Sequence, residues 1–355
     1  MHSVIFMRRA IISLVFCCLP LVVFAARVPG LYEAQVPVLN QKQENREAAI
    51  KSAMRIVLVK LTGNRYAVDQ TALSPLIEEA EKYLLQYRFI EIPPSESVPS
   101  EGDNIMQIWV RFDETALNNT LRELGIPVWG KERPSVLVWL AIEDESGRHL
   151  VSLEEKPEYV AILDKKAKSR GIVLVFPLLD LEDNSKLRAS DVWGGFQQPI
   201  LDASSRYHAD TILVGKVESP VTDIWEGQWT AYTGKTITSW TVEGELPDVV
   251  LDEGIDSVVD MLAKVFTESL TLAETAGVEL EVDNILTVEQ YARVLDYLNS
   301  LSSVTDVQVK KAESGKMLFS LTAHGGEVAV KQAIALGRTL ESLGANEKNV
   351  YRLLP

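Results

Sequence analysis

The stretch SVLVWLAIED, residues 135–144, is a largely apolar run with the length of one buried strand. It is followed by the amphipathic segment EYVAILDKKAKSRG (158–171) and by a second apolar run, GIVLVFPLLD (171–180). Two parallel strands need a long crossover between them, usually a helix, so this order predicts parallel pairing in a buried sheet. The segments 196–210 and 211–219 repeat the order as a helix that leads into the strand TILVGKVES.

Two aromatic strands, DIWEGQWTAY (223–232) and KTITSWTVEG (235–244), come next and contain a Gly-Lys-Thr tripeptide at their junction. A P-loop requires a glycine five residues before the glycine of this tripeptide, and a helix after it. The earlier position is Trp229, and the residues after the tripeptide are strand-like. We therefore expect a β-hairpin turn at Gly234, with a positive φ angle, and no bound nucleotide.

Three tryptophans of this hairpin are the candidate binding residues. Trp225 and Trp229 are four residues apart and so share one face of their strand, and Trp240 lies on the partner strand. Large aromatic side chains dominate both protein cores and binding hot spots. The spacing is compatible with core packing and with an exposed patch for a protein or glycan partner.

The residues before this region indicate a separate N-terminal α/β domain, residues 26–132. The segment 44–63 is predicted to be a helix that Gly63 ends, with its buried face formed by Ile50, Ala53, Met54, Val57, Leu58 and Leu61. The other predicted elements are a strand at 31–38, a second helix at 71–89, a loop at 92–104, a strand at 104–113 and a helix at 114–125.

The middle domain is assigned to residues 133–275, and its last element is predicted to be the helix IDSVVDMLAKVFTESL (255–270). Residues 276–355 follow the order β-α-β-β-α-β, which is the order of a ferredoxin-like fold, an antiparallel sheet with two helices on one face. The second of these helices is expected to span 327–344, and NVYRLLP is expected to form the last strand. The predicted fold class is therefore α/β and α+β, in three domains.

The N-terminus resembles a secretory signal peptide, residues 1–25. Arg8 and Arg9 precede an apolar run that ends at the small residue Ala25, where cleavage is expected. An uncleaved anchor is the alternative. Both cysteines, Cys17 and Cys18, fall within this segment, and the bulky residue before Cys17 argues against lipid attachment. We therefore expect a periplasmic protein without disulfides and without a membrane tether, unless the signal stays uncleaved.

The charge of the chain narrows the class of partner. Because the first 25 residues contain two arginines and no acidic residue, 33 basic and 50 acidic residues remain after them. A surface this acidic repels phosphate backbones and anionic headgroups, so we expect no nucleic-acid partner.

No segment matches a catalytic motif of the common hydrolases, zinc proteases or dinucleotide enzymes. His149 is expected in a turn, His208 at the end of a helix, and His324 in a strand-to-helix turn. The acidic stretch DLEDNS (180–185) is interpreted as a solvated loop rather than a calcium site, and Lys165, Lys166, Lys168 and Arg170 as the solvated face of a helix. We expect no catalytic residues, metal or cofactor.

Two stretches carry a family resemblance. R-x-x-A-I-x-x-A-x-x-x-V-L-V-K-L-T-G at 46–63, and Y-H-A-D-T-I-L-V-G-K-V at 207–217 with the tryptophan hairpin, resemble the uncharacterised Gram-negative family called domain of unknown function 2066. Residues 135–270 are more distantly similar to periplasmic domains of curli-secretion and penicillin-binding-protein-activator lipoproteins. Those families act by binding proteins, but the chain lacks a convincing lipidation cysteine.

The sequence therefore predicts a periplasmic binding or assembly factor of the cell envelope. Its partners would be envelope proteins or a wall polymer, bound at exposed sheet edges or at the tryptophan hairpin. Two alternatives remain open: an envelope hydrolase that uses carboxylates, and a component of an oligomeric ring or collar.

Overall fold

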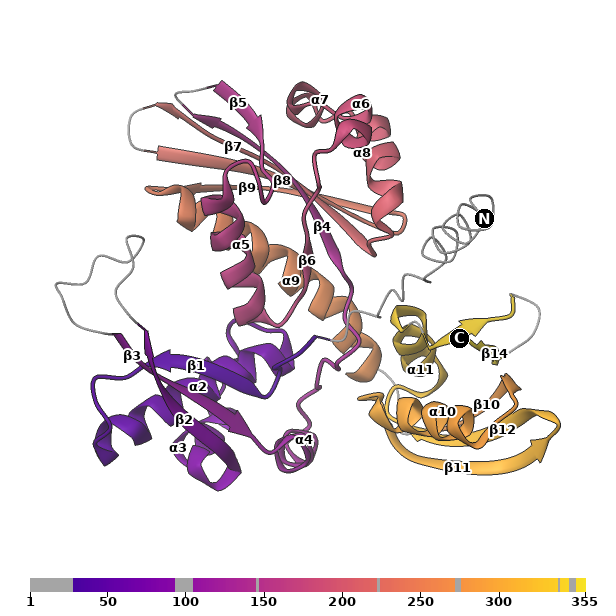
Figure 1. The fold of residues 1–355 in the computed structure, drawn as a ribbon. Coiled ribbons are helices and arrows are strands. Elements are labelled where there is room, and N and C mark those ends of the chain that lie inside the picture. The colour runs from indigo at the N-terminus through magenta and orange to yellow at the C-terminus, as the bar shows by residue number, and fades with distance from the viewer. Residues whose placement is uncertain are drawn as a thin grey trace, which may run out of the picture.

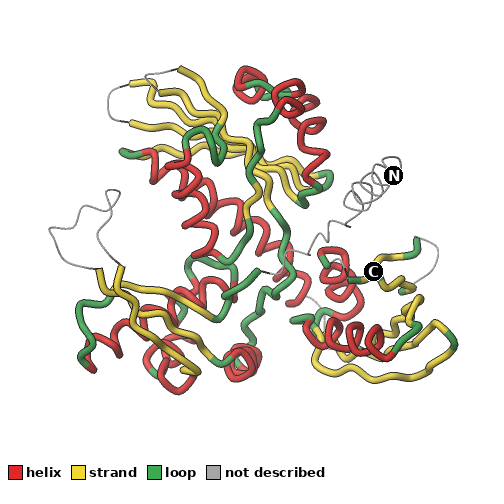
Figure 2. The backbone as a smooth tube through the Cα atoms, in the orientation of Figure 1, coloured by secondary structure: helices red, strands yellow, loops and turns green. Residues whose placement is uncertain are grey.

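The computed structural model describes residues 28–92, 105–144, 147–221, 224–271, 276–337, 339–344 and 349–355. Within these ranges the chain is a mixed α/β protein with three β-sheets and ten α-helices (Figure 1, Figure 2). Each sheet is built from one stretch of sequence, which defines an N-terminal, a middle and a C-terminal unit. The predicted signal peptide lies outside the described residues, and none of the helices within them has the length and hydropathy to cross a membrane.

The N-terminal unit has one antiparallel sheet in the order β1-β3-β2. Its strands are β1 (Glu33–Pro37), β2 (Leu84–Ile92) and β3 (Ile105–Phe112), and its helices are α2 (Gln43–Thr62), α3 (Ser74–Glu78) and α4 (Glu114–Glu123). The predicted face of α2 is confirmed, because all six of its apolar residues are fully buried. Gly63 ends α2 in the left-handed conformation, as expected.

The predicted helix at 71–89 is observed only over α3, and its second half is wrong. Short 3₁₀ turns at Thr71–Leu73 and Ala80–Tyr83 flank α3, and the chain then enters β2, which pairs antiparallel with β3. The backbone partners of β2 come from a strand beyond residues 93–104, so no local pattern reveals them. The predicted loop at 92–104 falls almost entirely outside the described residues.

The middle unit is a six-stranded sheet with helices on both faces (Figure 1). The strands are β4 (Val136–Asp144), β5 (Gly147–Leu150), β6 (Leu174–Val175), β7 (Thr211–Val221), β8 (Ile224–Thr233) and β9 (Thr236–Gly244). Their order is β5-β4-β7-β8-β9, and β6 also pairs with β4. Helices α5 (Pro157–Arg170) and α9 (Pro247–Thr271) pack on one face; α6 (Leu181–Lys186), α7 (Ala189–Gly194) and α8 (Gln197–Ser204) pack on the other.

The predicted parallel pairing is confirmed, because β4 runs parallel to both β6 and β7. The second apolar run contributes only two residues to the sheet, however. Beyond Val175 the neighbouring edge of β4 is taken by β5, and Pro177 has no backbone N–H with which to extend the ladder.

The acidic stretch 180–185 is a helix, α6, and not a solvated loop. The Asp180 carboxylate caps it by accepting the backbone N–H groups of Glu182 and Asp183, at 3.1 and 3.0 Å. The Asp183 side chain is fully buried, accepts from Arg206 Nη1 at 3.1 Å and also accepts from the Tyr207 hydroxyl. Burial, together with this carboxylate, raises the pKa of Tyr207 to about 12. No local pattern in 180–185 points to these partners, because Arg206 and Tyr207 lie beyond α8 in the chain.

The C-terminal unit has a five-stranded sheet in the order β11-β12-β10-β14-β13. Its elements are β10 (Ala276–Ile285), α10 (Val288–Ser300), β11 (Val304–Glu313), β12 (Gly315–Ala323), α11 (Gly326–Leu336), β13 (Leu340–Ser342) and β14 (Val350–Leu353). Residues from both helices share one core with the sheet. The predicted β-α-β-β-α order is observed.

The end of this unit differs from the predicted ferredoxin-like sheet. Helix α11 ends at Leu336 rather than near 344, and the chain adds the strand β13, which pairs antiparallel with β14. As a result β14 runs parallel to β10. Gly337 allows the early stop, because a Cβ at this position would overlap the Tyr297 hydroxyl.

Candidate binding groove and strand edge

The tryptophan hairpin is formed by β8 and β9. Trp229 lies directly opposite Trp240, and Thr233 lies opposite Thr236, which leaves a two-residue turn. Gly234 in this turn has a φ of 57°, so the Gly-Lys-Thr tripeptide is the predicted hairpin turn.

The structure places Trp229 in the core. Its exposed fraction is 1%, and it packs with α9 residues in the middle-unit core. Three glycines make room for its ring, since a Cβ added to Gly215, Gly227 or Gly254 would come within 2.9 Å of indole atoms. The Trp229 side chain is therefore part of the core and cannot contact a partner.

Trp225 and Trp240 are half-buried and pack against the rim of the same core. Trp240 also lines a groove of about 420 Å³ between β9 and α9. The groove is formed by Thr238, Trp240, Thr241, Val242, Glu253, Ser257 and Met261. Glu253, Ser257 and Met261 are spaced four residues apart along one face of α9. Glu253 lies before residue 255, where the predicted helix begins. Of the three predicted tryptophans, Trp240 is the one placed at this groove.

The outer edge of β9 is open along its length. All nine residues of β9 pair with β8 without any irregularity, and the other side of β9 has no partner strand among the described residues. Residues 236–239 are all exposed, and Ile237 is 53% exposed. Glu243 is the single charged residue in the strand. An edge strand of this kind is a template for pairing with another chain.

The other edge strands of the described sheets are protected. β5, β6 and β13 are at most four residues long, and β1 has five residues and ends in Pro37. β2 and β11 are long, but each carries charged residues and at least one register irregularity. Short length, charge, proline and bulges are the features by which proteins prevent edge pairing. β9 has none of them in its first seven residues.

An ion-pair network forms one side of the groove and joins α9 to the N-terminal unit. Arg65 binds both Glu253 carboxylate oxygens, at 2.7 and 2.8 Å, and donates from Nε to Asp260 at 2.5 Å. From α5, Arg170 contacts Asp256 at 2.6 Å and Asp260 at 2.5 Å. The network fixes the acidic face of α9 and therefore the position of the groove wall.

This network corrects the interpretation of the basic residues on α5. Arg170 is buried, and Lys166 contacts Asp256 at 2.8 Å, so these two do not belong to a solvated face. Lys165 and Lys168 are exposed, as predicted. Spacing alone could not reveal that the acidic residues of α9 lie opposite.

A second joint between the two units is centred on Arg133. Its guanidinium is buried and donates to five backbone carbonyls, those of Lys60, Trp129, Gly130, Arg170 and Gly171. Burial and the nearby charge of Arg170 lower the pKa of Arg133 to about 9. Sequence reasoning missed this residue because it treated the surrounding segment as a domain boundary.

Lys60 and Gly63, from the motif at 46–63, belong to the same joint. Lys60 donates to the carbonyls of Gly30 and Glu33 at 3.2 and 2.8 Å, and burial, with Arg133 nearby, lowers its pKa to about 8. A Cβ at Gly63 would collide with Trp129. These motif positions therefore have a structural explanation.

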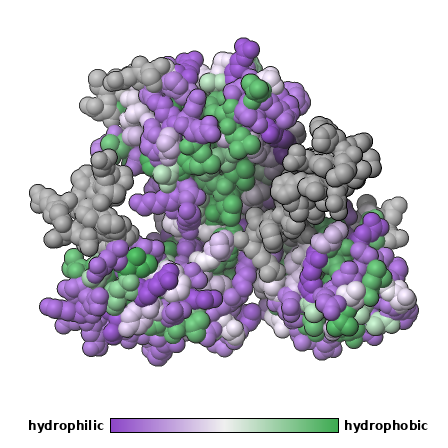
Figure 3. Space-filling model, viewed as in Figure 1, coloured by the Kyte–Doolittle hydropathy of each residue, from purple (hydrophilic) through white to green (hydrophobic). Residues whose placement is uncertain are grey.

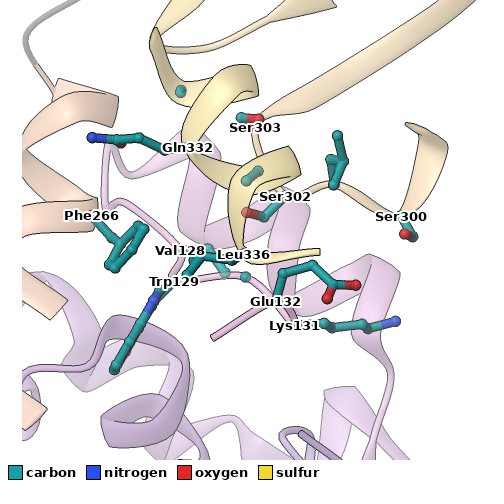
Figure 4. Close-up of a pocket in the computed structure, with 14 residues that line it drawn as sticks. Val128, Trp129, Lys131, Glu132, Phe266, Ser300, Ser302, Ser303, Gln332 and Leu336 are labelled. Carbon is teal, nitrogen blue, oxygen red and sulfur yellow. The ribbon is translucent and has the colours of Figure 1, made fainter. Parts of the chain in front are cut away.

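A small cavity of about 30 Å³ lies between the C-terminal unit and the rest of the chain (Figure 4). Trp129 Nε1, Ser303 Oγ and Gln332 Oε1 line it and are buried without a hydrogen-bond partner. A space of this size accommodates one water molecule, which could both accept from Trp129 and donate to Gln332. A wider cleft of about 460 Å³, with Arg122 and His324 in its wall, lies beside it.

The three histidines within the described ranges are dispersed. His149 lies in β5 rather than in a turn, with Nε2 3.7 Å from Asp144. His208 follows the 3₁₀ turn after α8 in the left-handed conformation, and His324 occupies the turn before α11, both as predicted in outline. No group of three or more metal-ligand side chains occurs within the described ranges.

The comparison with known families concerns the N-terminal unit. A family model described as "Domain of unknown function (DUF8605)" matches residues 25–130, so over this stretch the chain is similar to an uncharacterised family. This agrees with the prediction of an uncharacterised family, but it does not support the number 2066 or the likeness to the two lipoprotein families. No curated protein matches the chain. The groove and the β9 edge lie outside the matched residues.

Proposed function

We propose that the protein is a binding or assembly factor of the bacterial cell envelope that works in the periplasm. Its partner is an envelope protein, which lays an extended segment in the groove between β9 and α9. The proposal also draws on the signal-like N-terminus and on the resemblance of residues 135–270 to protein-binding periplasmic domains.

The groove is the observation that carries this proposal. Its apolar surface comes from Trp240, Val242 and Met261, which can accommodate an aliphatic or aromatic side chain. Glu253, the charged residue of the lining, is already paired with Arg65, but the chain as a whole has a net charge of −15. A segment with an apolar anchor and no acidic residues therefore fits best, since like charges across an interface are unfavourable.

Apolar residues also gather outside the groove, and the cleft of about 460 Å³ has Ile126, Val128 and Leu301 in its wall. Figure 3 shows apolar residues gathered at the centre of the middle unit, while the visible faces of the other two units are mostly hydrophilic.

Site-specific photo-crosslinking in cells tests the proposal. A photoreactive residue at Thr238, which lines the groove, is expected to capture one envelope protein. The same residue at Gln228, exposed on the opposite face of the hairpin, is expected not to capture it. Met261→Glu should abolish capture from Thr238 while the far-ultraviolet circular dichroism stays unchanged.

Two further measurements complete this test. Overlapping synthetic peptides from the captured protein should bind the purified chain, and Met261→Glu should weaken that binding at least tenfold. Equal capture from both positions, or no peptide binding, would contradict the proposal. Fractionation that leaves the full-length chain in the cytoplasm with residues 1–25 uncleaved would contradict the proposed location.

The hydrolase alternative draws no support from the carboxylates that come together on α9. Asp252, Glu253, Asp256 and Asp260 all pair with Arg65, Lys166 or Arg170. Carboxylates engaged in these ion pairs are not free to donate a proton to a substrate.

A further inference from the structure

The long edge strand β9 raises the question of which chain pairs with it. Every other edge strand in the described sheets is short, charged, bulged or ended by proline, as shown above. β9 presents nine residues with one charge, near its C-terminal end. A strand that pairs with β9 must therefore avoid an acidic residue opposite Glu243, and it needs no charged residue at its other positions.

We propose that a second copy of this chain pairs with the edge, β9 against β9, in an antiparallel register centred on Ser239. An antiparallel pair of identical strands has a twofold axis, so each contact occurs twice. In this register Ile237 lies opposite Thr241, and Thr238 lies opposite Trp240. Lys235, the second turn residue, lies opposite Glu243 of the other copy.

Charge complementarity selects this register. Both charged residues of segment 235–244, Lys235 and Glu243, meet their opposites, and no like charges face one another. Opposite charges on directly paired residues stabilise a sheet, whereas like charges there destabilise it. Pairing also covers Ile237, which is 53% exposed in the single chain. The net charge of −15 per chain opposes association, but physiological salt screens it beyond about 8 Å.

Pairing of two β9 strands would bring the two grooves together. The twofold axis is perpendicular to the joined sheet, so the α9 helices of both copies lie on the same face of it. The two grooves then face each other across the joined strands and form one trough. This consequence rests on the proposed function of the groove, whereas the pairing itself rests on the edge alone.

Cysteine crosslinking tests the register. In the full chain with Cys17→Ser and Cys18→Ser, Ser239→Cys places two thiols opposite each other at the twofold axis. Thr241→Cys is the matched control, on the same strand and face; its two copies would be about 13 Å apart along the strand, too far for a disulfide. We expect mild oxidation to give a disulfide dimer with Ser239→Cys and a monomer with Thr241→Cys.

Charge reversal tests the selected contacts. By analytical ultracentrifugation in 150 mM salt, Lys235→Glu or Glu243→Lys should weaken dimerisation at least tenfold. The double variant should restore it to within about threefold, because each new pair is again of opposite charge. Lys165→Glu is the control for Lys235→Glu, because Lys165 is an exposed residue of α5 and its replacement changes the net charge by the same amount. It should not weaken dimerisation comparably.

The outcomes separate the two proposals. A monomer at 100 µM, crosslinking of Thr241→Cys instead of Ser239→Cys, or failure of the double variant to restore dimerisation would overturn the pairing. Met261→Glu should leave the dimer intact while it abolishes capture of the envelope protein. A dimer without a groove partner would therefore contradict the proposed function alone, and groove binding by a monomer would contradict the pairing alone.

Discussion

Replacement of Gly254 by alanine should destabilise the middle unit, and the effect should reverse when Trp229 is also replaced by alanine. Gly254 lies within α9, and three atoms of the Trp229 ring are within 2.8 Å of the position that a Cβ would occupy. Trp229 is 1% exposed and is enclosed by the sheet and α9, so its ring has little space into which to move.

The magnitudes follow from two opposing effects. Alanine is better than glycine inside a helix by about 1 kcal/mol, whereas overpacking a core costs about 1–3 kcal/mol. Gly254→Ala should therefore lower the free energy of unfolding by about 1 kcal/mol. Trp229→Ala alone should lower it by about 4 kcal/mol, and in that background Gly254→Ala should raise it by about 1 kcal/mol. The coupling between the two sites is then about 2 kcal/mol.

Urea unfolding followed by far-ultraviolet circular dichroism measures these differences, with hydrogen exchange of β4 peptides as a report on the middle unit. Gly277→Ala, where a Cβ meets no atom within 4 Å, is the control. An equal loss of stability from Gly254→Ala with and without Trp229 would refute the close-packing argument.

Three other predictions concern buried charge and the hairpin turn. Burial lowers the pKa of Lys60 from 10.5 to about 8, so the unfolded chain binds more protons between these values and stability rises with pH. Relative to Lys60→Met, the wild-type chain should gain about 2 kcal/mol between pH 7 and 10 in urea titrations, and parallel pH profiles would contradict this assignment. Gly234→Ala should cost about 1 kcal/mol because φ is 57° there, while Gly234→Asn should cost less; equal melting temperatures for the two variants would argue against backbone strain. Asp183→Asn should cost about 1–2 kcal/mol, since it replaces the buried carboxylate that accepts from the Tyr207 hydroxyl and the Leu179 N–H while Arg206 keeps Asp180, and it should lower the pKa of Tyr207 from about 12 toward 10 in ultraviolet titration; an unchanged tyrosine titration would remove Asp183 as a cause.

The elements that could be predicted from the sequence are those that local interactions specify. The apolar spacing from Ile50 to Leu61 identified the buried face of α2, and Gly63 identified its end. The parallel order around β4 followed from its strand-helix-strand succession. Gly234 marked the hairpin turn because a positive φ angle is a property of the residue itself.

Features that depend on distant partners could not be predicted in this way. The segment of β2 was predicted to be a helix because its backbone partners lie in the distant strand β3. Arg170 was predicted to be solvated because its partner Asp256 lies on the distant helix α9. The candidate groove belongs to the same class, because Trp240 and Met261 meet only when β9 and α9 pack together.

Periodicity, turn residues and charge act over a few neighbouring positions, so they were enough to predict the face of α2, the hairpin turn and the acidic character of the chain. They could not show that Trp229 is buried while Trp240 borders a groove, although both lie on the same face of one hairpin. The reason is that β8 has strands on both sides and α9 beneath it, whereas β9 is the last strand of the sheet. Burial depends on what a fold places around a residue, and that information is spread over the whole chain.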